Sequence, residues 1–491
     1  QRALNYRNLF DPSSGHIRGK VQGLWFSPFK AAEVNNFYTE GNAWHYSFTA
    51  QQDINGLMAL HGGAEKFANK LEALYTTSEA LSGREQQDVT GLIGQYAHGN
   101  EPSHHMAYLF NFAGKPWRTQ ELVHQILTEF YPNSPDGLIG NEDCGQMSAW
   151  YVLSAMGFYP VTPGSDVYVL GTPLFDEVSL HLENGKTFTI TAKNKSAKNF
   201  YVDNVTLNGK LHPATFIRHS DLENGGTMVF DMTAAPNKTR GVKPEDRPST
   251  EVSDASFTAV PFLDMSTNKF KTSLPVMLKT IDKNATIYYR VLKGKAGKNF
   301  TRYTKPFTVN NTTDIEFYAE RQGLRSAVVP QRFYKVPTDR TITVQSEVHP
   351  MYTAGGSAAL IDGITGTANW RTGEWQSYFA KDFEAVIDLK KLRPVSFVGV
   401  HVAQEVSPWI VYPKAVVFEI SNDGQTYRPL TTVENKITTD EKGPEVQTLG
   451  RAVKATGRYI RVRALSGGAL PAWHESAGQP THIFIDEVIV K

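Results

Sequence analysis

The sequence has 491 residues, a length that predicts two to four domains, each able to bury a core of its own. Its 50 Lys and Arg residues are balanced by 49 Asp and Glu residues, which gives a formal net charge of +1. Because no basic run is present that could neutralise a row of phosphates, the composition argues against nucleic-acid partners. No apolar stretch is long enough to span a bilayer, and a single cysteine leaves no disulfide framework.

The first third of the chain has the pattern of a helical domain. QRALNYRNLFDPSSG at 1–15 is typical of the end of a helix followed by a turn. Apolar residues then recur at helical spacing in four stretches: Ile54, Leu57, Met58 and Leu60; Phe67, Leu71 and Leu74; Met106, Tyr108, Leu109 and Phe112; and Leu122, Ile126, Leu127 and Phe130. Repeated helix, loop, helix units predict an α/α toroid, so residues 1–164 are expected to form part of a six-hairpin barrel.

Alternating apolar and polar residues replace the helical pattern at about residue 165. We expect residues 165–240 to be strands that pack on the barrel, with Asn-Gly type turns at 183–186 and 207–210. Residues 241–256 are polar and contain prolines, which predicts a linker. The fold class expected for the whole chain is therefore multidomain α + β.

Two β-sandwich domains are expected after the linker. Residues 257–337, with TSLPVMLKTIDKNATIYYRVL, resemble the chitobiase C-terminal or fibronectin-III-like modules of glycosidases, and we interpret them as a spacer. Residues 338–491, with WRTGEWQSYFAKDFEAVIDLKK and YPKAVVFEISNDGQTY, resemble the discoidin or coagulation factor 5/8 type C domain, a jelly roll that often binds carbohydrate. Candidate sugar-contacting rings are Trp370, Trp375, Trp409 and Trp473, although Trp375 also fits a core position.

The stretch GLIGNEDCGQMSAWYVLSAMGFYP at 137–160 joins a glycine-rich acidic loop to an apolar helix. Glu142 and Asp143 precede Gly145, which places both acids on the loop. Two acids at a helix N-terminus could serve only as caps. Glycine-rich loops held by rigid elements also carry catalytic groups, which favours carboxylates that face a cavity. We interpret Cys144 as a small buried thiol rather than a nucleophile.

Three blocks of the first half resemble glycoside hydrolase family 92, the bacterial exo-acting α-mannosidases. They are YTEGNAWHYSF at 38–48, GLIGQYAHGNEPSHHMAYLFN at 91–111 and GNEDCGQMSAWYVLSAMGFYPV at 140–161, and they follow the family's order. The resemblance implies an N-terminal β-sandwich followed by a helical barrel, so that this polypeptide would begin inside the barrel. It also implies calcium-dependent hydrolysis of terminal α-linked mannose with inversion.

Glycosidic cleavage needs a proton donor and a second carboxylate, which in an inverting enzyme stands roughly 6.5 to 9.5 Å away and acts through water. Glu40 lies between Tyr38 and Trp44, whose rings we expect to shield its carboxyl from water and favour the protonated form. The resemblance makes Glu40 the general acid; the alternative is a helix cap. For the general base we prefer Asp143, with Glu142 as the alternative.

The remaining candidate site residues are ligands of substrate or metal. HGNEPSHH at 98–105 lacks the H-E-x-x-H spacing of zinc sites, whereas the hard oxygens of Asn100 and Glu101 suit calcium. The resemblance likewise implies a Ca²⁺ that engages mannose hydroxyls and helps to distort the ring. We predict four substrate-binding residues, of which the two histidines could instead pack between helices: Trp44, His98, His104 and Asn141.

The expected activity is therefore that of an exo-α-mannosidase acting on mannose-containing glycans, such as N-glycans or mannan, with a weak preference for α-1,2 linkages. A periplasmic or cell-surface location in a bacterium would fit this activity. Two alternatives stay open. One is a glycosidase or phosphorylase of different specificity on the same toroid, and the other is a non-catalytic glycan-binding fragment.

Overall fold

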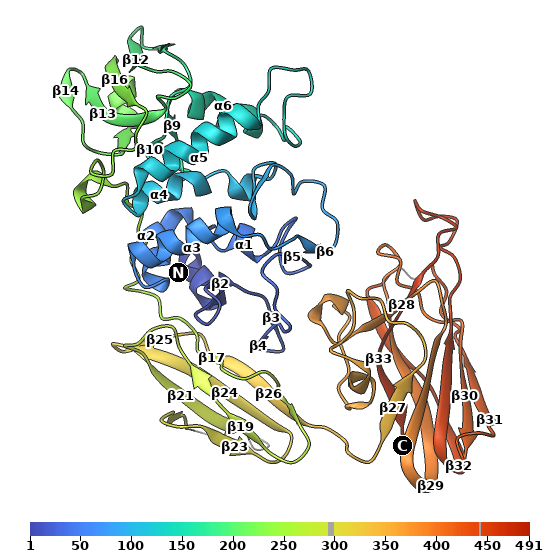
Figure 1. Ribbon diagram of the computed structural model, residues 1–491. Helices are drawn as coiled ribbons and strands as arrows, with labels where there is room; N and C mark the ends of the chain where they lie inside the picture. Colours follow the sequence, from blue (N-terminus) through green and yellow to red (C-terminus); the bar gives the residue numbers. More distant parts are fainter. Residues whose placement is uncertain (293–298, 441–442) are drawn as a thin grey trace.

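The computed structural model describes residues 1–292, 299–440 and 443–491. Its helices are concentrated in the first 160 residues, and strands dominate the remainder (Figure 1). The predicted fold class, a helical region followed by packed strands and then by two β-sandwich domains, is confirmed. Within the described ranges, no helix has the length and apolar character needed to cross a membrane.

The helical region contains the elements η1 (Arg2–Leu9), α1 (Ala43–Tyr46), η2 (Gln51–Asp53), α2 (Ile54–Leu60), α3 (Ala64–Thr76), η3 (Glu101–Ser103), η4 (Met106–Tyr108), α4 (Leu109–Phe112), α5 (Pro116–Glu129) and α6 (Gln146–Ala155). Short ribbons separate them: β1 (Phe10–Asp11), β2 (His16–Ile17), β3 (Lys20–Val21), β4 (Leu24–Trp25), β5 (Glu33–Val34), β6 (Ser82–Gly83), β7 (Leu92–Ile93) and β8 (Tyr96–Ala97). The predicted helix at 106–112 is split between η4 and α4. The apolar faces of α3 and α5 meet Trp150 of α6 in one core.

A five-stranded sheet lies beside α5, in the order β11-β12-β16-β13-β14 (Figure 1). The strands and helix of this region are β9 (Phe158–Tyr159), β10 (Val167–Leu170), β11 (Glu177–His181), β12 (Thr187–Lys193), β13 (Tyr201–Leu207), β14 (Lys210–Leu211), β15 (Phe216–Arg218), α7 (His219–Glu223) and β16 (Gly226–Thr233). Asn208 and Gly209 both have positive φ, 51° and 76°, as the predicted Asn-Gly hairpin requires. Gln120 of α5 accepts a hydrogen bond from the Val202 amide, which attaches the sheet to the helices.

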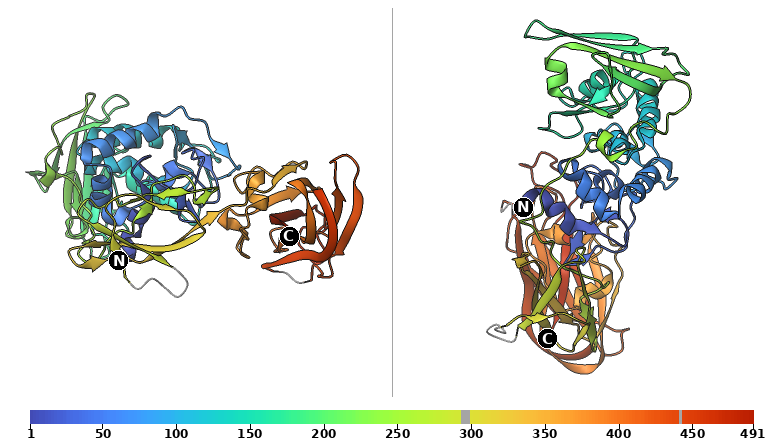
Figure 2. Two further views of the ribbon diagram at one scale, coloured as in Figure 1. Left: turned by 90° about the horizontal axis from the view of Figure 1, so that it is seen from below. Right: turned by 90° about the vertical axis from the view of Figure 1, so that its left-hand side faces the viewer.

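The second half of the chain forms two β-structures that are separate in Figure 2. After η5 (Pro244–Asp246), the first contains β17 (Phe262–Leu263), β18 (Lys269–Phe270), β19 (Leu274–Val276), β20 (Leu278–Lys279), β21 (Thr286–Leu292), β22 (Thr301–Arg302), β23 (Phe307–Val309), β24 (Thr313–Arg321), β25 (Leu324–Arg325) and β26 (Val329–Lys335). The second contains β27 (Thr341–Val344), η6 (Ser357–Ile361), η7 (Trp370–Thr372), β28 (Gln376–Phe379), β29 (Phe383–Gln404), β30 (Ala415–Ser421), β31 (Arg428–Glu434), β32 (Glu445–Leu465) and β33 (His482–Val490). Each has its own apolar core.

The β3–β4 hairpin of the helical region touches both of these β-structures. Leu24, only 8% exposed, joins the core that β17 to β26 build, and Trp25 packs against Phe262 with ring centroids 5.7 Å apart. On the other side, Gln22 donates a 3.1 Å hydrogen bond to Glu374 in the C-terminal structure. The hairpin therefore fixes the first β-structure on the helical region and supplies a polar contact to the second.

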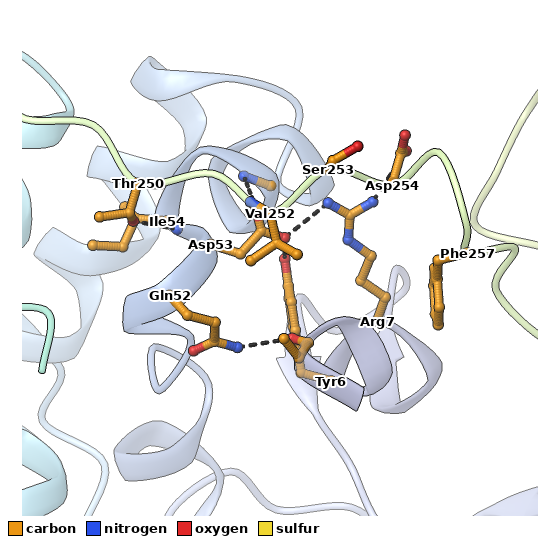
Figure 3. A network of polar contacts seen from close by, with 12 residues as sticks. Tyr6, Arg7, Gln52, Asp53, Ile54, Thr250, Val252, Ser253, Asp254 and Phe257 are labelled. Atoms are coloured by element: carbon orange, nitrogen blue, oxygen red, sulfur yellow. Dashed lines mark hydrogen bonds and ion pairs between the residues drawn. The ribbon is translucent and has the colours of Figure 1, made fainter. Parts of the chain in front are cut away.

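The segment predicted as a linker is anchored at its end by a buried carboxylate (Figure 3). Asp53 is fully buried and accepts hydrogen bonds from Arg7 Nη2 and Tyr6 Oη, both at 2.8 Å, and from the backbone amide of Val252 at 3.2 Å. Two residues after Val252, Asp254 accepts a 2.9 Å hydrogen bond from Arg321 on β24. These bonds join the N-terminal helix, the linker segment and the first β-structure.

Replacing Asp53 with Ala should lower the free energy of unfolding by about 3–5 kcal/mol, because it removes the closer of the two carboxylate partners of Arg7 and leaves buried donors without an acceptor. Thermal or urea unfolding followed by tryptophan fluorescence would measure the loss. Asp166→Ala is the matched control, since Asp166 pairs with Arg218 at the exposed surface and should cost no more than about 1 kcal/mol. Equal losses in the two variants would contradict the anchoring role of Asp53.

Candidate active site

Glu40 lies on the loop that enters α1, and its backbone has a φ of +53°, in the left-handed region that residues with a side chain rarely adopt. The helix itself is capped by Asn42, which accepts from the His45 amide while the Asn42 amide donates to His45 Nδ1, both at 3.3 Å. Glu40 is therefore not the cap, which removes the structural alternative for this residue. Strained conformations of this kind concentrate at functional sites.

The expected shielding of Glu40 by neighbouring rings is wrong. The Glu40 residue is exposed, whereas Trp44 is 7% exposed and its indole packs edge-on against His16, with centroids 4.6 Å apart. The Lys70 ammonium also lies over the Trp44 ring, 4.5 Å from its centroid. Because helix α1 turns Trp44 into the interior, the ring cannot cover the carboxyl that precedes it.

The two acids of the loop before α6, Glu142 and Asp143, differ in their hydrogen bonding. Glu142 accepts hydrogen bonds from the backbone amides of Gly145 and Ser148, and hydrogen bonding from Ser148 and then Gly145 holds the pKa of its carboxyl below the usual value. Glu142 therefore satisfies free N–H groups of the helix start. Asp143 has a φ of +51° and is exposed, and among the described residues no hydrogen bond from the start of α6 engages its carboxyl as it does that of Glu142. The thiol of Cys144 is exposed, not buried as the sequence suggested.

Glu40, Glu101 and Asp143 converge although they come from three separate blocks of the sequence. The pKa of Glu101 is raised, first by burial, then by its hydrogen-bonding contact with Asp143, and further by the negative charges of Asp143 and Glu40. Like charges at short range disfavour ionisation of one another. The fold thus brings both predicted catalytic acids into electrostatic contact with one predicted metal ligand.

Asn100 connects the predicted metal ligands to Glu40. Its side chain is 6% exposed, and Nδ2 donates a 3.0 Å hydrogen bond to the backbone carbonyl of Glu40. The Oδ1 atom and the neighbouring Glu101 carboxylate are hard oxygen donors of the kind calcium prefers. Among the residues that the structure describes, no three His, Cys, Asp or Glu side chains form a metal-binding group, so water or substrate would have to complete the shell.

The two predicted substrate histidines belong to the interior. His98 is fully buried, with Nδ1 bonded to Tyr96 Oη at 2.8 Å and Nε2 to Tyr131 Oη at 2.7 Å. His104 bonds to the His98 carbonyl at 2.9 Å through Nε2 and to Gln146 through Nδ1. Burial lowers the pKa of His98 well below its ordinary value and that of His104 to about 4, so both rings stay neutral. Both histidines therefore occupy the positions expected if they pack between the helices, the alternative to sugar binding.

Polar side-chain contacts join the loops around the site. Asn141, a predicted substrate ligand, is exposed and donates a 2.8 Å hydrogen bond to Asp88. Gln95 accepts a 2.9 Å bond from Asn42 and so ties the Glu40 loop to the strand region before the Asn100 block. Asp88 lies in a polar segment, whereas Gln95 is 2% exposed inside the block at 91–111. Neither residue was predicted as part of the site from the sequence.

The four tryptophans of the C-terminal domain differ in accessibility. Trp375 is 1% exposed and Trp370 is 7% exposed, and both belong to an interior cluster with Phe484. Trp409 is partly buried beside Val411, whereas Trp473 is 43% exposed. The expectation that Trp375 belongs to the core is confirmed, and Trp473 is the best placed of the four for contact with a ligand.

Comparisons with known proteins agree with the resemblance predicted from the sequence. An uncharacterized secreted glycosidase of Arthroderma benhamiae is 31% identical over 259 residues, which cover 47% of this chain and 31% of that protein. A family GH92 alpha-mannosidase of Bacteroides thetaiotaomicron in complex with mannoimidazole is 38% identical, covering 51% and 34% of the two chains with a TM-score of 0.49. A family GH92 inverting mannosidase of the same species is 37% identical, covering 51% and 35% with a TM-score of 0.46.

The chain spans about a third of the length of these relatives. Its C-terminal domain matches the F5/8 type C domain over residues 341–479. Residues 1–234, which contain all three acids of the site, match the glycosyl hydrolase family 92 catalytic domain.

Proposed function

We propose that the protein is an exo-acting α-mannosidase that removes terminal α-linked mannose from glycans with inversion of configuration. The observation that carries this proposal is the convergence of Glu40 and Asp143 on Glu101, with both predicted catalytic acids held in left-handed backbone. The match of residues 1–234 to the family 92 catalytic domain supports the reaction class. The names of two solved relatives, an alpha-mannosidase and an inverting mannosidase, suggest the sugar and the stereochemistry.

Each carboxyl has a separate task in this reaction. Glu40 would donate a proton to the glycosidic oxygen as the leaving sugar departs, and Asp143 would accept a proton from the water that attacks the anomeric carbon from the opposite face. The product first released would then be β-mannose. Glu142 is occupied by the start of α6, which favours Asp143 as the base and leaves Glu142 to hold the loop in place.

Calcium is the metal that the donor set fits best. The Asn100 amide oxygen and the Glu101 carboxylate would hold the ion, and mannose hydroxyls and water would supply the other ligands of its six- to eight-fold shell. When bound, a divalent cation would stabilise negative charge on the sugar hydroxyl oxygens and favour distortion of the ring. The pKa of Glu101 is raised by burial and further by the Asp143 and Glu40 charges, and the positive charge of the ion would offset the part due to those charges.

The natural substrates would be mannose-containing glycans such as N-glycans or mannan, with a weak preference for α-1,2 linkages. The match of residues 341–479 to the F5/8 type C domain and the exposed ring of Trp473 support glycan binding by the C-terminal domain. We also propose that the protein acts outside the cytoplasm, in the periplasm or at the cell surface, in keeping with the secreted glycosidase that it resembles.

Two other functions fit part of the molecule. The C-terminal domain alone would suit a non-catalytic glycan-binding protein, but a binder has no need for carboxyls held in strained backbone. A glycosidase or phosphorylase of another specificity would use similar loops on the same helical scaffold. Dependence of sugar release on inorganic phosphate would identify a phosphorylase.

Incubation of the full-length gene product with α-1,2-, α-1,3- and α-1,6-mannobiose should release mannose in the presence of calcium, and NMR should detect the β-anomer first. A chelator should abolish release, and added calcium should restore it. Release of the α-anomer first would contradict inversion. Failure to cleave any mannobiose by folded, calcium-supplied protein would contradict the mannosidase assignment.

Asp143→Asn should lower kcat for mannobiose by about 100-fold or more, because an amide cannot take the proton from the attacking water. Glu142→Gln is the matched control on the same loop. Its amide oxygen can still accept from the helix start, so kcat should fall much less than in the Asp143 variant, with a lower unfolding temperature. Steady-state kinetics of both variants would test this order, and the reverse order would move the base to Glu142.

A further inference from the structure

We infer that Asn100 is a positioning residue that holds the proton donor Glu40 in its working conformation, an inference that rests on the proposed function. The contact that carries it is the 3.0 Å hydrogen bond from Asn100 Nδ2 to the Glu40 carbonyl, which links residues 60 positions apart. Asn100 is only 6% exposed, so the surrounding protein restricts the orientation of its amide. Nothing in the sequence pattern of Asn100 distinguishes this task from metal binding.

Glu40 needs such support because its conformation is unfavourable on its own. A non-glycine residue at φ +53° persists only where its surroundings hold it. The residue after it has no room for a side chain, since a Cβ on Gly41 would lie 2.8 Å from His45 Nδ1. The carbonyl of Thr39, on the other side, accepts from Tyr46 Oη. Because the Glu40 side chain is exposed, the backbone contacts fix the point from which its carboxyl extends into the site.

Asn100 also adjoins the charged part of the site along the chain. Asn100 is followed directly by Glu101, whose carboxyl contacts Asp143 and interacts electrostatically with Glu40. The nitrogen end of the Asn100 amide serves the Glu40 backbone, and its oxygen end is the predicted calcium ligand. One side chain would therefore serve both the acid and the metal, and aspartate at this position would keep only the oxygen function.

This role predicts a defect that depends on the leaving group. A general acid matters most when the departing group is a poor one, such as a sugar, and least when it is a good one, such as dinitrophenolate. If Asn100 only stabilised the fold or only held the metal, both kinds of substrate should suffer equally. A misdirected Glu40 should slow the cleavage of mannobiose selectively.

The test compares Asn100→Ala and Asn100→Asp with the wild-type full-length protein in saturating calcium. For mannobiose, kcat/KM should fall by about 100-fold in both variants, the loss typical of a displaced catalytic group. For dinitrophenyl α-mannoside, kcat/KM should fall in Asn100→Asp by no more than about threefold, because this leaving group needs no proton. Calcium should still raise the unfolding temperature of Asn100→Asp. An equal fall for both substrates, or an unchanged rate with mannobiose, would overturn the inference.

Asn111→Ala is the matched control, since Asn111 is a fully buried amide that bonds to Thr119 and to the Tyr108 carbonyl, away from Glu40. It should lower stability without changing the ratio of the two rates. Hydrogen–deuterium exchange over residues 38–46 provides a readout that needs no activity, and exchange should accelerate in the Asn100 variants but not in Asn111→Ala. An inactive wild-type protein would refute the proposed function, whereas unchanged exchange in the Asn100 variants would refute the positioning role.

Discussion

Repulsion between carboxylates is the constraint on which the candidate site depends. Glu40, Glu101 and Asp143 come from three loops, and the pKa of Glu101 is raised first by burial and further by the neighbouring Asp143 and Glu40 carboxylates. Two of them also occupy left-handed backbone, at +53° and +51°. Neither arrangement is favourable in isolation, so free energy from the surrounding core must hold them. Such an arrangement is what an enzyme needs when one carboxyl must give up a proton and another must stay ionised.

The support for these loops comes from buried polar contacts rather than from the acids themselves. The His98 and His104 rings, neutral because of burial, fill the space under the Asn100 block and bond to Tyr96, Tyr131 and Gln146. Farther away, Asp53 fastens the N-terminal helix to the segment that leads to the β-structures. The loops that carry the candidate acids thus stand on an interior in which both ring nitrogens of His98 and of His104 are hydrogen-bonded.

Local chemistry made much of this predictable from the sequence. Gly145 and Gly157 bracket α6, the Asn208–Gly209 pair forms its hairpin, and loop positions for Glu40 and Asp143 follow from the glycines beside them. Long-range contacts were not predictable in the same way. Composition cannot tell that Val252 of a polar, proline-bearing segment meets Asp53 nearly 200 residues away, or that Trp44 turns inward and leaves Glu40 exposed. For the histidines, residue type fits both sugar binding and packing, and only burial separates the two.

The most direct measurement is a crystal structure of the full-length protein with calcium and a hydrolysis-resistant thio-linked mannobiose. We expect the terminal mannose to lie between Glu40 and Asp143, with their carboxyls roughly 6.5 to 9.5 Å apart on opposite faces of the ring. We also expect calcium beside Asn100 and Glu101. A sugar bound away from these acids, or a separation of only about 5 Å with no room for water, would contradict an inverting centre built from Glu40 and Asp143.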